Sequence, residues 1–210
     1  MSVLDKSGVR ALADEGDPLV IELGCGDRKK HADSIGIDMR DLPGVDLVGD
    51  AEDALRTLPD GCARLVTSSH FMEHVADARA LLAQTARVLQ PGGLAQITVP
   101  HFSNPYFYSD PTHERFYGLY TLSYWVHDPL LRRRVPQYDA PLPFTLQSVY
   151  YRFRSSTAFP IRRALKKPVQ WLVNATRGTQ EFYEENLCWL LPCYDIRFVL
   201  ERDAEETNRP

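Results

Sequence analysis

Three acidic residues and two glycines near the start of the chain have types and spacing that suit ligand binding. Glu22 precedes Gly24 and Gly26, and Asp38 and Asp50 follow the next two apolar runs. Glycine permits a tight turn and lets the backbone approach a ligand closely. Carboxylates accept hydrogen bonds, so Asp38 suits a pair of ribose hydroxyls, Asp50 an amine at the adenine end, and Glu22 an ammonium group. We expect a nucleoside ligand without phosphate at this place.

A dinucleotide-binding loop fits the same segment poorly. Its fingerprint has a third glycine at position 29, where this chain has Lys29, and an acid about 20 residues further on. Here Asp38 comes only 12 residues after Gly26. A full helix barely fits between the two strands, so a pyrophosphate bound at a helix N-terminus is not expected.

These residues must be positioned by a sheet, and the apolar runs predict its strands. Short runs at 19–23, 35–37, 45–48, 65–67 and 94–99 read as buried strands. A helix is expected over 77–89, ended by Pro91-Gly92-Gly93. Later in the chain we expect a strand at 146–154, an amphipathic helix at 161–173 and a last strand at 194–201. Alternating strands and helices favour a parallel sheet with helices on its faces.

Five segments together resemble class I S-adenosylmethionine-dependent methyltransferases. Motif I of the family is similar to Ile21-Glu-Leu-Gly-Cys-Gly-Asp27, and its ribose-binding second strand is similar to Ile35-Gly-Ile-Asp38. The adenine-contacting turn resembles Val48-Gly-Asp-Ala51. The segment after the fourth strand resembles residues 65–74, and the helix end before the fifth strand resembles Arg87-Val-Leu-Gln-Pro-Gly-Gly93. The resemblance covers about residues 19–101. The stretch from Pro100 to His113 also looks like a bacterial subgroup that acts on small molecules and surface glycans.

The resemblance implies S-adenosylmethionine as cofactor and S-adenosylhomocysteine as product. Lys29 and the short first helix leave the contacts to the methionine end open. A Rossmann-like domain that uses another nucleotide, or none, is the alternative. The residues expected around the cofactor are Glu22, Gly24, Cys25, Gly26, Asp38, Met39, Asp50, Ala51, Ser68, Ser69 and His70.

Methyl transfer to an oxygen requires alignment of the acceptor and often removal of one proton. Histidine, with a pKa near 6.5, suits that task. The fifth strand ends at His101, and a long aromatic segment follows it with Asp110 and His113. We therefore expect His101 or His113 as the base, with Asp110 orienting one of them; His70 ranks third.

The same segment allows two other interpretations. His101, Asp110, His113 and Glu114 could bind a divalent metal, but no ligand spacing demands one, so no metal is expected. The aromatic side chains could contact a sugar or ring, or form a core under a long loop. The residues expected to bind substrate are Tyr106, Tyr108, Tyr117 and Glu184.

The net charge of −4 hides a basic segment. Residues 131–177 carry ten Lys and Arg side chains and a single acid, Asp139. The basic side chains include Arg132 to Arg134 and four residues on the helix expected at 161–173. Such a segment suits an anionic carrier or a membrane surface, and we expect peripheral membrane contact through residues 161–177. A nucleic-acid partner is not expected, because the chain is acidic and no binding module is recognisable.

Length and composition set the remaining expectations. The chain has 210 residues with 44% hydrophobic and 25% charged, which fits one globular domain. It has no secretory signal at residues 1–17, no apolar run near the roughly 20 residues of a membrane span, and four cysteines without a zinc pattern. These features predict a cytoplasmic protein that can contact the inner face of the membrane.

The predicted fold is α/β: a Rossmann-like, doubly wound, mostly parallel seven-stranded sheet with an antiparallel last strand. Residues 1–210 form a single methyltransferase domain, with a cofactor-binding core at 1–100 and substrate-side insertions at 101–145 and 156–193. The expected reaction is O-methylation of a small or carrier-linked metabolite such as a carbohydrate or glycolipid. The alternatives are methyl transfer to nitrogen, sulfur or carbon, and a non-catalytic protein that binds S-adenosylmethionine or S-adenosylhomocysteine at a membrane. The sequence leaves the oligomeric state open.

Overall fold

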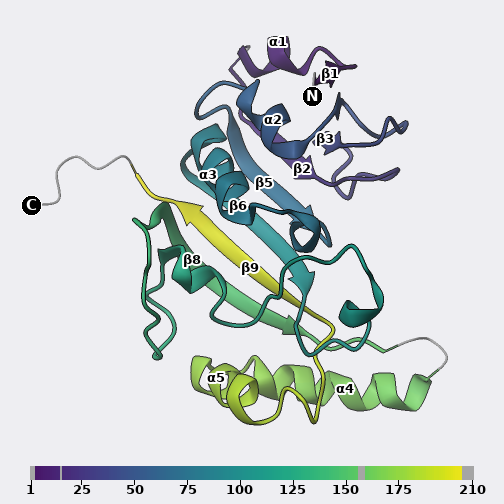
Figure 1. Cartoon of the computed structure of the whole chain (residues 1–210), viewed down its shortest axis with the longest axis vertical. Helices are drawn as coiled ribbons and strands as arrows, with labels where there is room; N and C mark the ends of the chain where they lie inside the picture. The colour runs from purple at the N-terminus through teal and green to yellow at the C-terminus, as the bar shows by residue number, and fades with distance from the viewer. Residues whose placement is uncertain (1–2, 15, 156–158, 205–210) are drawn as a thin grey trace, which may run out of the picture.

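The computed structural model describes residues 3–14, 16–155 and 159–204. Its described residues form one mixed sheet with short and long helices packed beside it (Figure 1). From edge to edge the strands are β1 (Leu4–Asp5), β4 (Leu47–Val48), β3 (Ile35–Asp38), β2 (Leu19–Leu23), β5 (Ala63–Ser69), β6 (Leu89–Pro100), β9 (Asp195–Arg202), β8 (Leu142–Arg152) and β7 (Val126–His127).

The centre of the sheet is parallel and its C-terminal part is antiparallel. Strands β4, β3, β2, β5 and β6 run in parallel, whereas β9 is antiparallel to both β6 and β8. The predicted Rossmann-like fold with a reversed last strand is confirmed. The two-residue strands β1 and β7 add an edge on each side that the sequence does not predict, because two residues give no periodic signal.

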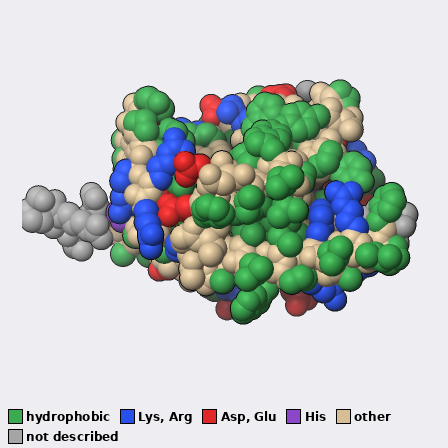
Figure 2. Space-filling model, turned by 90° about the horizontal axis from the view of Figure 1, so that it is seen from below, with side chains coloured by type: hydrophobic (Ala, Val, Ile, Leu, Met, Phe, Trp, Pro, Cys, Tyr) green, Lys and Arg blue, Asp and Glu red, His purple; other side chains and the backbone are tan. Residues whose placement is uncertain are grey.

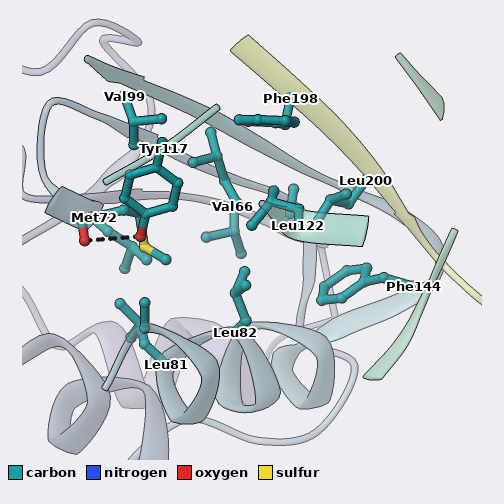
Figure 3. Packing of buried hydrophobic residues seen from close by; sticks show 14 of the residues in the cluster. Val66, Met72, Leu81, Leu82, Val99, Tyr117, Leu122, Phe144, Phe198 and Leu200 are labelled. Carbon is teal, nitrogen blue, oxygen red and sulfur yellow. Dashed lines mark hydrogen bonds between the residues drawn. The ribbon is translucent and has the colours of Figure 1, made fainter. Parts of the chain in front are cut away.

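Helix α3 (Ala78–Val88) shows why the sequence adopts this fold. Asp77 caps it by accepting a hydrogen bond from the Ala80 N–H at 2.9 Å. Leu81 and Leu82 lie on its buried face and pack toward Val66 of β5 and the Tyr117 ring (Figure 3). The helix observed at 78–88 matches the expected 77–89 closely because its apolar spacing is regular.

The remaining helices are α1 (Val9–Asp14), α2 (Ala51–Arg56), α4 (Pro160–Val173) and α5 (Arg177–Asn186), with single 3₁₀ turns η1 (Met72–His74), η2 (Phe107–Ser109) and η3 (Leu122–Tyr124). Helices α4 and α5 lie together beside β8 (Figure 1). Among the described residues, no helix has the length and apolar character needed to cross a bilayer. Positions 156–158 of the second predicted insertion lie outside the described residues.

No helix occupies residues 24–34 between β2 and β3, all of which are described. Two carboxylates hold this loop instead. Glu22 accepts a hydrogen bond from the Lys30 N–H at 2.8 Å, and Asp46 lies 2.6 Å from the Lys29 ammonium and accepts the Gly36 N–H at 2.8 Å. The short spacing between strands therefore produces a loop fastened by acids where a doubly wound fold ordinarily has a helix.

Candidate active site

The turn after β2 lies at the C-terminal edge of the sheet, where open α/β folds bind their ligands. Gly24 and Gly26 have φ angles of 63° and 62°, in the left-handed region that favours glycine. A Cβ atom on Gly24 would lie 2.5 Å from the Phe71 ring. The turn therefore requires glycine at position 24 for both its conformation and its packing.

Asp38 and Asp50 stand at the neighbouring strand ends. Asp38 accepts one hydrogen bond on each carboxylate oxygen, from the Gly26 and Arg40 N–H groups, both at 2.9 Å. Asp50 caps α2 through one oxygen, which accepts the Glu52 and Asp53 N–H groups. Both carboxylates keep acceptor capacity for a ligand. Met39 beside Asp38 is exposed, and Ala51 is buried.

The position of Glu22 differs from the one expected for a residue that binds an ammonium group of the ligand. It is buried and holds the backbone of the 24–34 loop, and Ser34 Oγ lies 3.5 Å from the same oxygen. Lys29 turns away to Asp46 and the Ser34 carbonyl. Burial raises the pKa of the neighbouring Cys25 thiol to about 11, which keeps it protonated.

These carboxylate acceptors therefore fit the nucleoside end of S-adenosylmethionine. Asp38 offers free acceptor positions to ribose hydroxyls, Asp50 offers them to the adenine amine, and Met39 offers an exposed thioether for apolar contact. At the other end of this edge, Ser68 is buried, and its hydroxyl has no hydrogen-bond partner within the part of the chain that the structure describes; Ser69 is half-buried.

His70 follows β5 in a left-handed conformation, with φ of 54°. Its ring nitrogens lie 3.6 Å from Asp195 and 3.6 Å from Glu73. The Asp195 and Glu73 carboxylates beside its ring raise the pKa of His70 to about 9, so its imidazole is charged at neutral pH. Arg152 in turn grips Asp195 with two hydrogen bonds, at 2.5 and 2.7 Å.

Sequence reasoning missed Arg152 and Asp195. Asp195 begins the antiparallel strand β9 and pairs with Pro100 at the end of β6, so the reversed strand brings its first residue to the cofactor edge. The expected reversal of that strand was the signal that could have found Asp195. Arg152 pairs with Asp195 across β8 and β9, which depends on a register that sequence alone does not give.

His101 is fully buried and its two nitrogens are both occupied. Nδ1 lies 2.8 Å from Ser103 Oγ, and Nε2 lies 2.8 Å from Glu184 Oε2. Glu184 also accepts hydrogen bonds from the Leu119 N–H and the Tyr151 hydroxyl, at 2.7 and 2.8 Å. Burial alone would raise the pKa of Glu184, but hydrogen bonds from His101, Leu119 and Tyr151 hold it below its usual value.

This arrangement corrects the sequence-based picture of His101 and Glu184. A general base must reach the proton that it removes, and a substrate contact must face the ligand. The buried pair instead joins α5 to the end of β6, away from solvent. Tyr117, also expected to contact substrate, is fully buried and donates its hydroxyl to the Met72 carbonyl at 3.1 Å (Figure 3). It lies in the core, as the alternative interpretation of the aromatic segment holds.

His113 and Asp110 come together as expected, with Nε2 and Oδ2 3.7 Å apart. The Thr112 hydroxyl and N–H donate to the other Asp110 oxygen and lower the pKa of that carboxyl. Tyr106 and Tyr108 are both exposed beside them, and Tyr108 donates its hydroxyl to the Phe102 carbonyl. The described structure thus keeps one histidine and aspartate pair and two exposed tyrosines as candidates on the substrate side.

Comparison with known proteins supports the class of this fold. The family model described as methyltransferase domain matches residues 22–97. Those residues are a methyltransferase domain. The matched segment runs from the glycine turn through β6 and includes the Asp38, Asp50 and Ser68 positions. The chain is accordingly an S-adenosylmethionine-dependent methyltransferase, with that molecule as the methyl donor.

Solved structures support the fold along nearly the whole chain. An S-adenosylmethionine-dependent methyltransferase from Archaeoglobus fulgidus is 19% identical with a TM-score of 0.55, covering 94% of this chain and 95% of its own. A putative methyltransferase from Bacillus halodurans is 15% identical with a TM-score of 0.54, covering 92% and 98%. Phosphoethanolamine N-methyltransferase 2 of Haemonchus contortus is 13% identical with a TM-score of 0.51, covering 90% and 49%. A search of curated proteins finds no match.

Proposed function

We propose that this methyltransferase methylates an oxygen of a carrier-linked metabolite, with a glycolipid as the leading case, held at an anionic membrane surface. S-adenosylmethionine supplies a methyl group bound to a positively charged sulfur. The chain's own residues must bind it, admit the acceptor and handle the acceptor's proton. The observation that carries the proposal is the outer face of helix α4.

Helix α4 has its apolar face turned toward solvent. Its half-buried and buried positions, Lys166, Val169, Gln170 and Val173, face the protein, and Gln170 binds the Phe153 N–H at 2.9 Å. The helix predicted at 161–173 is present, but Ile161 and Leu165 are 77% and 65% exposed. A surface helix of a globular protein ordinarily buries its apolar stripe, so an outward stripe indicates a partner.

Basic side chains flank this stripe. Ile161, Leu165, Pro168 and Leu172 recur at three-to-four spacing and share the outer face, while Trp171, 72% exposed, lies at its border. Exposed Arg162 and Lys167 lie on the two sides of the stripe, and exposed Arg163 lies further round the same helix. Figure 2 shows hydrophobic side chains running along this face with Lys and Arg around them. An apolar stripe bordered by Lys and Arg matches the headgroup region of an anionic bilayer.

The apolar surface continues toward the substrate side of the sheet. Trp189 and Leu190, after α5, are exposed, and Lys166 reaches from α4 to the Pro192 carbonyl of the same segment. The Trp189 ring lies 5.3 Å from the ring of Phe102, the second residue after β6. An acceptor anchored in lipid would therefore lie near the C-terminal edge of the sheet, which suits a lipid-linked substrate.

The membrane part of the proposal is tested by binding to vesicles of neutral phosphatidylcholine, with and without phosphatidylglycerol. We expect binding to anionic vesicles with a blue shift in the emission of Trp171. Changing Arg162, Arg163 and Lys167 together to Gln should weaken binding about 100-fold, at about 1 kcal/mol per basic residue near the surface.

A matched variant changes three exposed arginines elsewhere, Arg10, Arg56 and Arg64, to Gln. It should bind vesicles as the unaltered protein does, and Trp171→Phe should bind but lose most of the blue shift. Equal binding to neutral vesicles, equal weakening in both triple variants, or burial of the α4 face by self-association in sedimentation would contradict the membrane proposal.

The acceptor is tested by transfer of an isotopically labelled methyl group from S-adenosylmethionine. Glycolipid precursors in anionic vesicles should be methylated at oxygen, faster than water-soluble nucleotide-sugars. Product carrying the label on nitrogen, sulfur or carbon would contradict the oxygen acceptor. Binding of the cofactor with no transfer to any acceptor of the panel would favour the non-catalytic alternative.

A further inference from the structure

A cluster of two histidines and one carboxylate lies beside the cofactor edge. Glu73 and His74 belong to η1, and His113 comes from the loop after η2. The atoms that these three side chains can offer to a metal lie within 4.8 Å of one another. The rings of His74 and His113 are 4.8 Å apart between centroids.

The backbone fixes these two segments against each other. The N–H groups of Glu114 and Arg115 both donate to the Glu73 carbonyl, at 2.8 and 3.2 Å. The Arg115 guanidinium also donates to the carbonyls of Val75 and Ala76. The three side chains are therefore held together without a ligand, as a pre-organised site requires.

Hydrogen bonds set the tautomer of both histidines. His113 Nδ1 lies 2.9 Å from the Phe107 carbonyl, and His74 Nδ1 lies 3.2 Å from the Thr112 carbonyl. A carbonyl only accepts, so each Nδ1 carries a proton and each neutral ring presents an unprotonated Nε2. Metal-binding histidines are typically oriented in this way, by donation of the other ring N–H to a carbonyl or carboxylate.

Glu73 provides the independent sign of a missing ligand. Its side chain is fully buried, yet neither carboxylate oxygen has a hydrogen-bond partner among the described residues. Its nearest cationic neighbour, His70 Nδ1, is 3.6 Å away. Buried carboxylates are normally hydrogen-bonded as well as paired, so the contact with charged His70 leaves the hydrogen-bonding capacity of Glu73 unfilled, which a metal ligand role would explain.

We propose that Glu73, His74 and His113 bind a divalent transition metal of the zinc class. Two imidazoles and a carboxylate are typical ligands of Zn²⁺ and related ions, and three protein ligands leave a position open for substrate. Asp110 Oδ2, 3.7 Å from His113 Nε2, is close enough to become a further ligand after a small rotation. The sequence hides the site because its ligands come from two segments without a regular spacing.

The role of the ion rests on the proposed function, whereas the site itself does not. A hydroxyl bound to such an ion has a lowered pKa and loses its proton to solvent water more readily. The acceptor oxygen would thus be prepared for methylation by the ion. This assigns His113 to metal binding in place of the base role expected from sequence.

The test uses the full chain without a polyhistidine tag and Co²⁺ as the probe. Visible absorption should reveal saturable binding of one Co²⁺ per chain, displaced by Zn²⁺. His74→Ala and His113→Ala should each weaken Co²⁺ binding at least 30-fold, and Glu73→Gln should weaken it while keeping the fold. His127→Ala, which removes an exposed imidazole on β7, should leave it unchanged.

A second readout keeps the test decisive if a variant is poorly folded. Zn²⁺ should raise the melting temperature of the unaltered protein and of His127→Ala, but not that of His74→Ala. Absence of saturable binding, equal binding in all variants, or an intense thiolate-to-cobalt band would overturn the proposal. These measurements contain no acceptor, so their failure would leave the proposed acceptor untouched.

Discussion

At the scale of single residues, the buried Glu184 and His101 pair shows how the polar interior is stabilised. Glu184 accepts three hydrogen bonds, from His101, Leu119 and Tyr151. Hydrogen bonds to a charged group contribute about 1.5–3 kcal/mol each to the free energy of unfolding. The pair therefore joins α5, β8 and the end of β6 into one unit.

Glu184→Gln should lower the free energy of unfolding by about 2 kcal/mol at pH 7, because the amide replaces a charged acceptor. The folded-state pKa of Glu184 lies below the ordinary value of 4.5, so this stabilisation is present above about pH 4.5 and is lost as pH falls through the folded pKa. Urea unfolding of both proteins at pH 7 and below pH 4.5 measures the difference.

The exposed neighbour gives the control, since Glu185→Gln should change the unfolding free energy by less than about 0.5 kcal/mol. A penalty for Glu184→Gln that stays constant down to the lowest pH would show that the charge of Glu184 contributes nothing to stability.

At the scale of elements, the loop between β2 and β3 connects two parallel strands that a helix ordinarily connects in this fold. Its backbone is fastened by Glu22 from β2, and the Lys29 and Asp46 pair ties it to the segment before β4. The pair is only one-fifth exposed at Lys29, so it is screened less than a surface pair.

Lys29→Ala should destabilise the fold by about 2 kcal/mol, because Asp46 loses its charged partner while it stays partly buried. Lys6→Ala removes a comparable 2.6 Å contact to the exposed Asp41 and should cost less than about 1 kcal/mol. Chemical denaturation of the two variants measures both values. Equal penalties would contradict the structural role given to Lys29.

Elements with a regular pattern were predictable from sequence, and those without one were not. Helices α3 and α4 and strand β9 lie within one residue of the expected bounds because their apolar spacing is clear. Helix α5 was missed: its buried residues include the polar Gln180, and its start depends on a capping box between Thr176 and Thr179. Asp38 and Asp50 lie at the expected strand ends, whereas the burial of His101 and Tyr117 and the partial burial of Glu184 depend on tertiary contacts that no local pattern contains.

At the scale of the whole molecule, the candidate cofactor-binding residues and the candidate histidines lie along one edge of the sheet. The glycine turn, Asp38 and Asp50 come from the parallel strands, and the segments after β5 and β6 bring the histidines. Helix α4 adds an outward apolar stripe bounded by basic side chains. Residues 22–97, which match the methyltransferase domain model, contain the proposed cofactor residues, and we propose that the later half of the chain forms the acceptor side.

The most direct test of the central claim is titration calorimetry with S-adenosylmethionine and S-adenosylhomocysteine. We expect one-to-one binding of both by the unaltered protein, and about 1–3 kcal/mol weaker binding by Asp38→Ala through lost ribose hydrogen bonds. No binding of either ligand, with the acceptor present or absent, would contradict the cofactor assignment, and unchanged affinity in Asp38→Ala would remove Asp38 from the ribose site.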